Sequence, residues 1–384
     1  MVLAVRRGSP VRRVAKRFGV THGTVQYWVT RTRRRRLDRV DFADRPRGRP
    51  RPVNRVSQRI EKRVLKLRRD LKDRSALGEC GAAAIARELV RGGVHLIPCV
   101  RTIGRILYRH GVLDARHRLR RPPPPKGWYL PEVAARKAEI DSFDLVTDLV
   151  IQGGQAVTVL NGISLHGGLP VSWPEARITA KITVEKLMSH WRRYGLPHFA
   201  KFDNDTIFQG AHQWADSFGR VIRLCLQLGV NPIFAPPREP GFQAEIESYN
   251  GRWQRMVWHR VTHQSLQALQ VYSGRFVEAL IERSASRISL APERRVVPKD
   301  FRLDLCRPLA GSLTFIRRTN AEGRVQCLGH SWPITTDWVH RLVRLDVDLS
   351  QGRVTCFALR RREPDEIRLL KSFRYQPLHK RFSE

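Results

Sequence analysis

The chain has few cysteines, and their spacing excludes the usual cysteine-based sites. Six cysteines are scattered over 384 residues, with no Cys-x-x-Cys pair and no Cys/His set at zinc-finger spacing. We therefore expect reduced thiols rather than a zinc site or a disulfide framework. A Gly-Lys-Ser/Thr phosphate-binding loop is also missing, so any use of ATP would require another protein.

Long apolar runs are missing as well. No stretch approaches the length that spans a bilayer, and the N-terminus lacks the charged, apolar and small-residue order of a signal peptide. These features predict a soluble cytoplasmic protein with no membrane partner.

Acidic residues are scarce relative to basic ones. Asp and Glu number 35 against 71 Lys and Arg, which gives a formal net charge of +36. Residues 1–130 hold +26 of that charge. Such an excess favours a partner with closely spaced phosphates. We expect double-stranded DNA, bound mainly by the first third of the chain, and a location at the bacterial nucleoid.

Residues 1–44 are predicted to form a helix-turn-helix DNA-binding domain. A helix starting after Ser9 and Pro10 carries apolar residues on one face, with Phe18 among them, and Gly19 ends it. Thr21 can cap a second, recognition helix. A plain two-helix core would show the same spacing, but the arginine run that follows is hard to pack. The expected DNA contacts are Thr21, His22, Thr24, Gln26, Tyr27, Arg31, Arg33, Arg34, Arg35 and Arg36.

Residues 45–55 are predicted to be a basic linker, because their prolines exclude a helix. Arg47 and Arg49 flank a glycine in this segment, and such a narrow basic strand suits insertion into the minor groove. A linker without groove contacts is the alternative interpretation.

Residues 56–118 are predicted to form a second helix-turn-helix domain. A basic helix over about 57–71 precedes two shorter apolar-periodic segments separated by two glycines and a proline. Arg101, Arg105 and Arg109 form a basic stripe on the last helix. This stripe indicates contacts with the DNA backbone, or else a solvated helix face.

Residues 119–130 contain four consecutive prolines and predict a stiff linker before a core over residues 131–300. The apolar spacing then changes from helical to strand-like. Three strand-like runs are followed by a helix over about 180–194, a strand at 199–202, a helix over about 213–228, a strand at 230–235 and a helix over about 242–258. The order βββαβαβα is that of a ribonuclease-H-like mixed sheet.

Three carboxylates fall where this order would bring them together. Asp141 lies on the first strand, Asp203 at the end of the fourth, and Glu247 early in the last helix. Hard oxygen ligands suit Mg²⁺ or Mn²⁺, and two such ions can assist an in-line displacement at phosphorus. Asp144 and Asp148 lie close to Asp141, so a shift of register would transfer the role of the first carboxylate.

The segments at 195–197, 202–204 and 236–251 carry a recognisable set of motifs. They read Gly-Leu-Pro, Phe-Asp-Asn and Pro-Pro-Arg-Glu-Pro-Gly-Phe-Gln-Ala-Glu-Ile-Glu-Ser-Tyr-Asn-Gly. With the two front modules, the chain resembles, over residues 1–375, the insertion-sequence DDE transposases that have a retroviral-integrase catalytic core. The resemblance implies that Asp141, Asp203 and Glu247 are the catalytic and metal-binding residues. Asn204 is a candidate for positioning the substrate phosphate, or else caps the following turn. Asn250 and Arg252 are candidates for contacts with the DNA end, or else lie on a solvated helix face.

Two features depart from this pattern. Asp205 follows Asn204 where relatives often have glycine, and 43 residues separate Asp203 from Glu247. Glu239, with 35 intervening residues, is nearer the usual spacing and is a rival third carboxylate. Glu247 is preferred because the prolines around Glu239 place it in a loop before the helix.

Residues 305–376 alternate in short strand-like runs separated by glycine turns, and they predict a small β-barrel. The expected fold is therefore a multidomain α and α/β protein with helix-turn-helix modules, a ribonuclease-H-like core and this barrel.

The expected function is that of a DNA transposase. The resemblance implies binding to terminal inverted repeats and target DNA, metal-dependent phosphodiester hydrolysis and strand transfer. Because two ends must be joined, a homo-oligomer on DNA is expected, and some relatives also use a separate ATPase partner. The alternative is a catalytically inactive DNA-binding regulator derived from a transposase.

Overall fold

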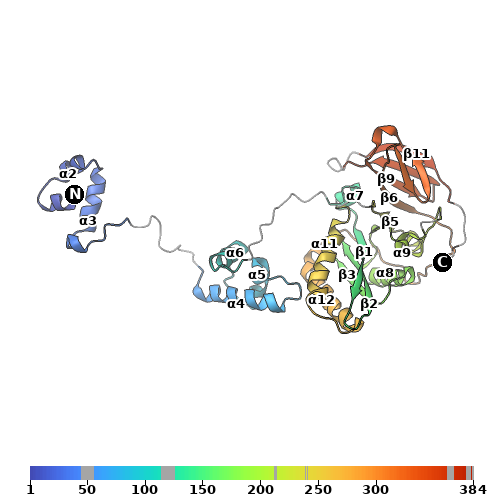
Figure 1. The fold of residues 1–384 in the computed structure, drawn as a ribbon, viewed down its shortest axis with the longest axis horizontal. Coiled ribbons are helices and arrows are strands. Elements are labelled where there is room, and N and C mark those ends of the chain that lie inside the picture. Colours follow the sequence, from blue (N-terminus) through green and yellow to red (C-terminus); the bar gives the residue numbers. More distant parts are fainter. Residues whose placement is uncertain are drawn as a thin grey trace. The chain divides into compact units, whose positions relative to one another are not determined.

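The computed structural model describes residues 1–44, 56–113, 126–211, 214–237, 239, 241–360, 367–377 and 382. The chain divides into two compact units, residues 1–60 and 61–384, and each is considered by itself (Figure 1). The linker predicted at 45–55 lies outside the described residues, as does most of the one at 119–130. None of the described helices combines the length and the apolar character that crossing a bilayer would demand.

The first unit is a small helical domain. Its core consists of Val14, Ala15 and Val25. The elements are α1 (Val2–Arg6), α2 (Val11–Arg17), α3 (His22–Arg31) and the 3₁₀ turn η1 (Leu37–Arg39). The two helices predicted from the sequence are present, and α1 is an additional one.

Both ends of the turn between α2 and α3 follow from local chemistry. Thr21 caps α3, because its hydroxyl accepts a hydrogen bond from the backbone N–H of Thr24 at 3.2 Å. Phe18, which the sequence predicts on the inner face, is 47% exposed instead. It is the C-cap of α2, where the chain has already left the helix.

The second helical module consists of α4 (Gln58–Arg74), α5 (Ala82–Arg91) and α6 (Val100–Arg109). Apolar residues at helical spacing are buried on each helix. They include Val64, Ala84, Ile85, Leu89, Ile103, Ile106 and Leu107. The module thus has the three-helix organisation expected of a second helix-turn-helix domain.

The core is a mixed α/β sheet with the predicted element order. The strand order is β3-β2-β1-β4-β5. β2 pairs antiparallel with both β1 and β3, whereas β1, β4 and β5 run parallel. The bounds are β1 (Ile140–Val150), β2 (Ala156–Ser164), β3 (Pro170–Glu175), β4 (Phe199–Phe202) and β5 (Asn231–Phe234). This is the ribonuclease-H-like arrangement that the sequence predicts.

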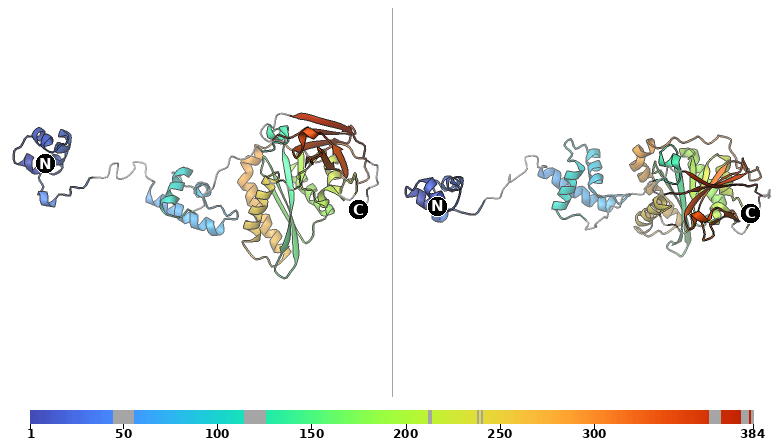
Figure 2. Two further views of the ribbon diagram at one scale, coloured as in Figure 1. Left: turned by 45° about the horizontal axis from the view of Figure 1, so that its top comes forward. Right: turned by 90° about the horizontal axis from the view of Figure 1, so that it is seen from above.

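Helices cover both faces of this sheet, with α8 on one side and α11 and α12 on the other (Figures 1 and 2). On the first side lie α8 (Ala180–Tyr194), α9 (Thr206–Gln209) and α10 (Arg220–Gln227). On the second lie α11 (Ala244–Trp253), its π-helical extension η2 (Gln254–Trp258) and α12 (Leu266–Ser289). The short helix α7 (Pro131–Ala134) precedes β1. The helix predicted over 213–228 is shorter, because Gly219 is the N-cap of α10.

The C-terminal strands are antiparallel, but they extend the core sheet. β6 pairs in parallel with β5, and the order continues β6-β9-β10-β11, so that nine strands form one sheet. The sequence predicts a separate small barrel here. The alternation of apolar residues predicts where strands form, but not which strands pair. The pairing of β6 with β5 could therefore not be predicted. The bounds are β6 (Ser312–Arg318), β7 (Arg324–Cys327), β8 (His330–Pro333), the 3₁₀ turn η3 (Thr336–Trp338), β9 (Leu342–Asp348), β10 (Arg353–Ala358) and β11 (Arg368–Arg374).

Candidate active site and nucleic-acid interface

Two aspartates on β1 face opposite sides of the sheet. Successive side chains of a strand alternate between faces, so residues three positions apart lie on different faces. Asp141 accepts a hydrogen bond from the indole N–H of Trp191 on α8 (3.3 Å). Asp144 instead accepts one from the side-chain amide of Asn250 on α11 (2.7 Å). Only Asp144 therefore shares a face with the helix that carries Glu247.

Asp141 is enclosed and its charge is compensated. It is 2% exposed, and both of its oxygens accept from the guanidinium of Arg294, with Nη1 lying 3.0 Å from Oδ2. His190 lies 3.9 Å from the same oxygen, but burial lowers the pKa of His190 to about 4, so the imidazole is neutral near pH 7. The sequence places Asp141 beside Asp203 and Glu247, and the structure places it on the other face.

Strand register selects Asp144 in its place. β1 and β4 pair in parallel with Ser142 opposite Lys201. Continuing that register by two residues sets Asp144 level with Asp203, which directly follows β4. The two side chains therefore occupy neighbouring strands at the same edge of the sheet.

The pKa of Asp144 also reflects the neighbouring carboxylates. Burial, followed by the negative charges of Asp203 and Glu247, raises the pKa of Asp144 from 3.8 to about 6. The hydrogen bond from Asn250 opposes this shift. The negative charges of Asp203 and Glu247 thus act on Asp144. We call these three residues the carboxylate cluster.

Asn250 orients the first member of the carboxylate cluster. Its amide nitrogen donates to Asp144, and its amide oxygen accepts from the side chain of Asn161 on β2 at 2.9 Å. Both ends of the amide are used within the protein, so Asn250 acts on the position of Asp144. The sequence alone suggests direct positioning of the substrate.

The residues after Asp203 form a short capped turn. The backbone N–H of Asp205 donates to Asp203 at 3.0 Å, and the carboxylate of Asp205 caps α9 by accepting from Ile207 N at 2.8 Å. The departure from glycine at position 205 is therefore explained as a helix cap. Asn204 donates to the backbone oxygen of Ala235 and accepts from Arg317, each at 2.7 Å, so it fixes the ends of adjacent strands.

The rival third carboxylate lies elsewhere. Glu239 precedes α11 and forms an ion pair with Arg318 of β6. Glu247, exposed in the first turn of α11, contributes to the field at Asp144. Of the two rivals, Glu247 is the one whose negative charge acts on Asp144.

A buried polar layer lies directly beneath the carboxylate cluster. Lys201 is fully buried, and its ammonium donates to Glu245, to the backbone oxygen of Phe242 (2.8 Å) and to the hydroxyl of Tyr129 (3.2 Å). Ser142 donates to the same carboxylate of Glu245 at 3.3 Å. Ser142, Lys201 and Glu245 each precede a member of the carboxylate cluster by two residues. This layer ties the start of α11 to β1 and β4.

The donor set at the carboxylate cluster fits a hard divalent cation. In the described part of the chain, no three His, Cys, Asp or Glu side chains lie close enough together to hold a metal by themselves. Mg²⁺ needs only one or two carboxylates, since water and substrate phosphate supply its other ligands. Asp144 and Asp203 provide such oxygens, and a cation between them would relieve the repulsion that raises the pKa of Asp144.

The first helical domain presents a polar face on α3. His22, Gln26 and Tyr27 are exposed, and His22 and Gln26 are one helical turn apart on the same face. Thr21 and Thr24 share a hydrogen bond of 2.9 Å at the start of the helix, so these two predicted DNA contacts also serve the cap.

The arginines at the end of α3 and after it differ in the contacts that they make. Arg31 donates to the backbone oxygens of residues 41 and 43 and lies over the ring of Trp28, 4.7 Å from its centroid, so it holds the end of the domain. Arg36 pairs with Asp38 at the surface. Arg33, Arg34 and Arg35 are exposed at the surface. Arg47 and Arg49 lie outside the described residues.

The second module exposes Arg101 and Arg105 on α6, as the sequence predicts. Arg109, the third member of the stripe, forms an ion pair with the buried Glu61 at 2.7 Å. Arg252 on α11 donates to Glu79 at 3.1 Å, so its guanidinium has a protein partner.

Comparison with known proteins places a homeodomain-like domain family over residues 24–107, which is a helix-turn-helix region. Solved structures similar to this chain come from retroviruses. A simian T-cell lymphotropic virus intasome, in complex with the PP2A regulatory subunit B56 gamma, matches over 72% of this chain and 88% of its own, with 14% identity and a TM-score of 0.32. The HTLV-2 integrase catalytic core with magnesium matches over 37% and 84%, with 11% identity and a TM-score of 0.26. The BIV integrase catalytic core matches over 37% and 81%, with 16% identity and a TM-score of 0.26.

Proposed function

We propose that this protein is a DNA transposase that cuts and joins DNA strands at the carboxylate cluster of Asp144, Asp203 and Glu247. One observation carries the proposal. The register of β1 with β4, continued by two residues, sets Asp144 level with Asp203, and Asp144 accepts a hydrogen bond from the helix that bears Glu247. In a chain with a net charge of +36 and a homeodomain-like region, the natural substrate of such a site is a DNA phosphodiester.

The residues divide the chemical work among them. Asp144 and Asp203 would hold Mg²⁺ or Mn²⁺, with Glu247 completing the site from α11. When bound, two such ions stabilise the charge of an in-line displacement at phosphorus. Asn250 fixes the carboxylate of Asp144, and the Lys201 layer fixes the start of α11 and with it the position of Glu247. Water would be the nucleophile for cleavage and a DNA 3′-hydroxyl for joining, without a covalent enzyme intermediate.

The helical modules would supply recognition of the element ends. The exposed polar face of α3 suits base contacts in a major groove, and Arg101 and Arg105 suit backbone contacts. Joining two ends requires at least two copies of this chain on the DNA, and a separate ATPase is compatible with this scheme. Terminal inverted repeats and target DNA would then be its partners at the nucleoid.

The test compares three substitutions in the full chain, with DNA that contains the native reading frame and its flanks as substrate. Asp144→Asn and Asp203→Asn are each expected to lower Mg²⁺-dependent cleavage by about a thousandfold or more, with DNA affinity unchanged. Asp141→Asn, on the other face, should retain cleavage within about tenfold at a temperature where it is folded.

A second readout of the same variants does not depend on activity. Without DNA, Mg²⁺ should raise the Tm of the wild type and of Asp141→Asn, but not that of Asp144→Asn. Cleavage retained by Asp144→Asn would overturn the assignment. A wild-type protein that binds the ends but never cleaves with Mg²⁺ or Mn²⁺ would be the inactive regulator instead.

A further inference from the structure

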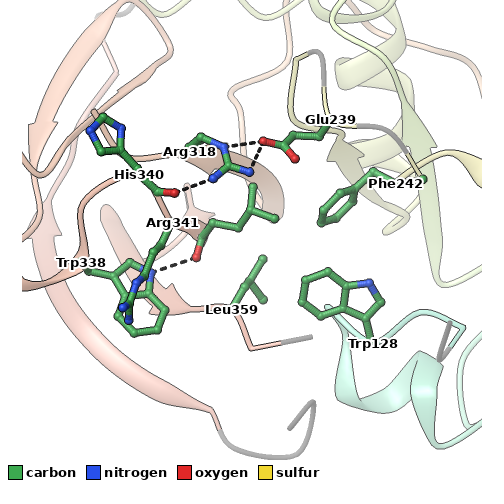
Figure 3. A pocket seen from close by; sticks show the side chains of 10 residues that line it. Trp128, Glu239, Phe242, Arg318, Trp338, His340, Arg341 and Leu359 are labelled. Atoms are coloured by element: carbon green, nitrogen blue, oxygen red, sulfur yellow. Dashed lines mark hydrogen bonds and ion pairs between the residues drawn. The ribbon is translucent and has the colours of Figure 1, made fainter. Parts of the chain in front are cut away.

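A pocket of about 270 Å³ lies between the start of α11 and the C-terminal strands (Figure 3). Trp128 and Phe242 line one side of it, and Trp338, with Arg341, lines the other. The remaining lining residues are Glu239, Gly241, Arg318, His340, Leu342 and Leu359. We call this cavity the aromatic pocket. It is separate from the carboxylate cluster, and the transposase mechanism above makes no use of it.

The aromatic pocket combines an apolar floor with a charged rim. Trp128, Phe242 and Trp338 are each 6–7% exposed, and the rings of Trp128 and Phe242 are 5.4 Å apart. Arg341 and His340 are exposed at the opening, and the guanidinium of Arg341 lies 4.7 Å from the centroid of Trp338. Such a site is wide enough for one flat heterocycle and lies beside a guanidinium and an imidazole.

The pocket also offers hydrogen bonds of both kinds at one edge. Glu239 supplies carboxylate oxygens, and Arg318 supplies N–H groups, with the two paired to each other. The edge of a nucleobase presents donors and acceptors side by side, which such a pair can match. A free anion would meet the negative charge of Glu239, so a simple phosphate site is disfavoured.

Phe242 connects the pocket to the start of the catalytic helix. Its ring lines the pocket, while its backbone oxygen accepts from Lys201 in the layer beneath the carboxylate cluster. Only four residues separate Phe242 from Glu247 along the chain. A DNA strand bound at the carboxylate cluster would therefore pass close to this pocket.

We propose that the aromatic pocket takes one unpaired nucleotide of a DNA strand. The base would stack against Trp338 or Phe242, and the adjoining phosphates would contact Arg341 and His340. The proposal rests on the proposed function in so far as DNA is the substrate. It adds that the protein unpairs, or selects, a nucleotide next to the position of cleavage.

The experiment uses the full chain without divalent metal and measures binding and photo-crosslinking. One probe is a duplex with a short single-stranded end that carries 5-iododeoxyuridine, and the other is the same duplex fully paired. Crosslinks identified by mass spectrometry are expected at Trp128, Phe242, Trp338 or His340, and only with the single-stranded end.

Substitutions give a quantitative test. Trp338→Leu and Arg341→Gln are each expected to weaken binding of the single-stranded end by about tenfold, with less than about a twofold effect on the paired duplex. Arg353→Gln, an exposed arginine of β10, is the matched control and should change neither. Because Trp338 is buried, Trp338→Phe serves as a second variant that keeps an aromatic ring and should restore most of the affinity.

Outcomes for the two proposals are distinguishable. Crosslinks that map elsewhere, or an equal loss for both probes, would overturn the pocket and leave the cleavage assay untouched. A protein that captures the single-stranded end at the pocket but never cleaves DNA would overturn the transposase and leave the pocket standing.

Discussion

The two faces of β1 surround an aspartate with opposite charges. On the α8 face, Asp141 is almost completely buried, and Arg294 neutralises it with two hydrogen bonds. On the α11 face, Asp144 is half-buried, and its neighbours include Asp203 and Glu247, which carry the same charge. A carboxylate paired with a cation and one surrounded by like charges thus lie only three positions apart on one strand.

This difference indicates which carboxylate serves the structure and which serves chemistry. A buried charge with an opposite partner needs nothing further, and removing that partner is costly. Like charges held together cost stability by themselves, and a cation or proton relieves that cost, which is why perturbed carboxylates gather at functional sites. The α8 face therefore carries a structural ion pair, and the α11 face carries the carboxylate cluster.

Removing the cation that pairs with Asp141 on the α8 face should have the largest effect on stability. Arg294→Met leaves the carboxylate of Asp141 buried without its cation and is expected to cost about 3–5 kcal/mol in the free energy of unfolding. Chemical denaturation of the full chain measures this cost. Asp144→Asn, on the other face, should cost nothing at neutral pH.

The double variant Asp141→Leu/Arg294→Met provides the control for this prediction. An apolar pair in the same place removes the stranded charge, so most of the lost stability should return. A single Arg294→Met variant as stable as the wild type would show that Asp141 is not held by its charge partner.

The compensated pair on the α11 face allows a second, smaller test. Lys201→Met should cost about 2 kcal/mol, because Glu245 is only partly exposed and loses its cation. It should also raise the Mg²⁺ concentration needed for half-maximal cleavage, since the start of α11 is no longer tied to β4.

Lys186→Met is the matched control for Lys201→Met. Lys186 pairs with Glu175 in a more exposed position, so its removal should cost less than about 1 kcal/mol and leave the Mg²⁺ dependence unchanged. Equal shifts in the two variants would show that Lys201 has no special role in placing α11.

Local signals in the sequence predict much of this fold. Thr21 marks the start of α3, and the helix over 180–194 ends at Gly195, as the pattern indicates. The order of strands and helices in the core follows from the change of apolar period, because each element forms largely from its own residues. Asp203 is predictable for the same reason, since it directly follows an apolar strand.

The face of β1 could not be read from the sequence. Asp141 and Asp144 lie on the same strand, and the choice between them depends on the register with β4 and on an arginine 153 residues away. The continuation of the sheet from β5 into β6 is likewise a pairing of distant segments. Lys201 left a usable signal, because a lysine inside a short apolar strand requires a buried partner.

The effect of the like charges around Asp144 on the α11 face can be tested by measuring stability as a function of pH. Burial and like charges raise the pKa of Asp144 to about 6 in the folded protein, against 3.8 for an ordinary aspartate, so folding favours its protonated form. Below about pH 4, Asp144 is protonated in both states and does not change the free energy of unfolding. As the pH rises to about 6, Asp144 ionises in the unfolded chain before it ionises in the folded protein, so the folded state loses stability. Because Asp144 is partly exposed, we expect about 1–2 kcal/mol rather than the full shift. Asp144→Asn should therefore match the wild type near pH 4 and exceed it by that amount above pH 7, in denaturation without divalent cations. A difference that stays constant between these pH values would mean that the like charges do not interact, and the contrast between the two faces would be lost.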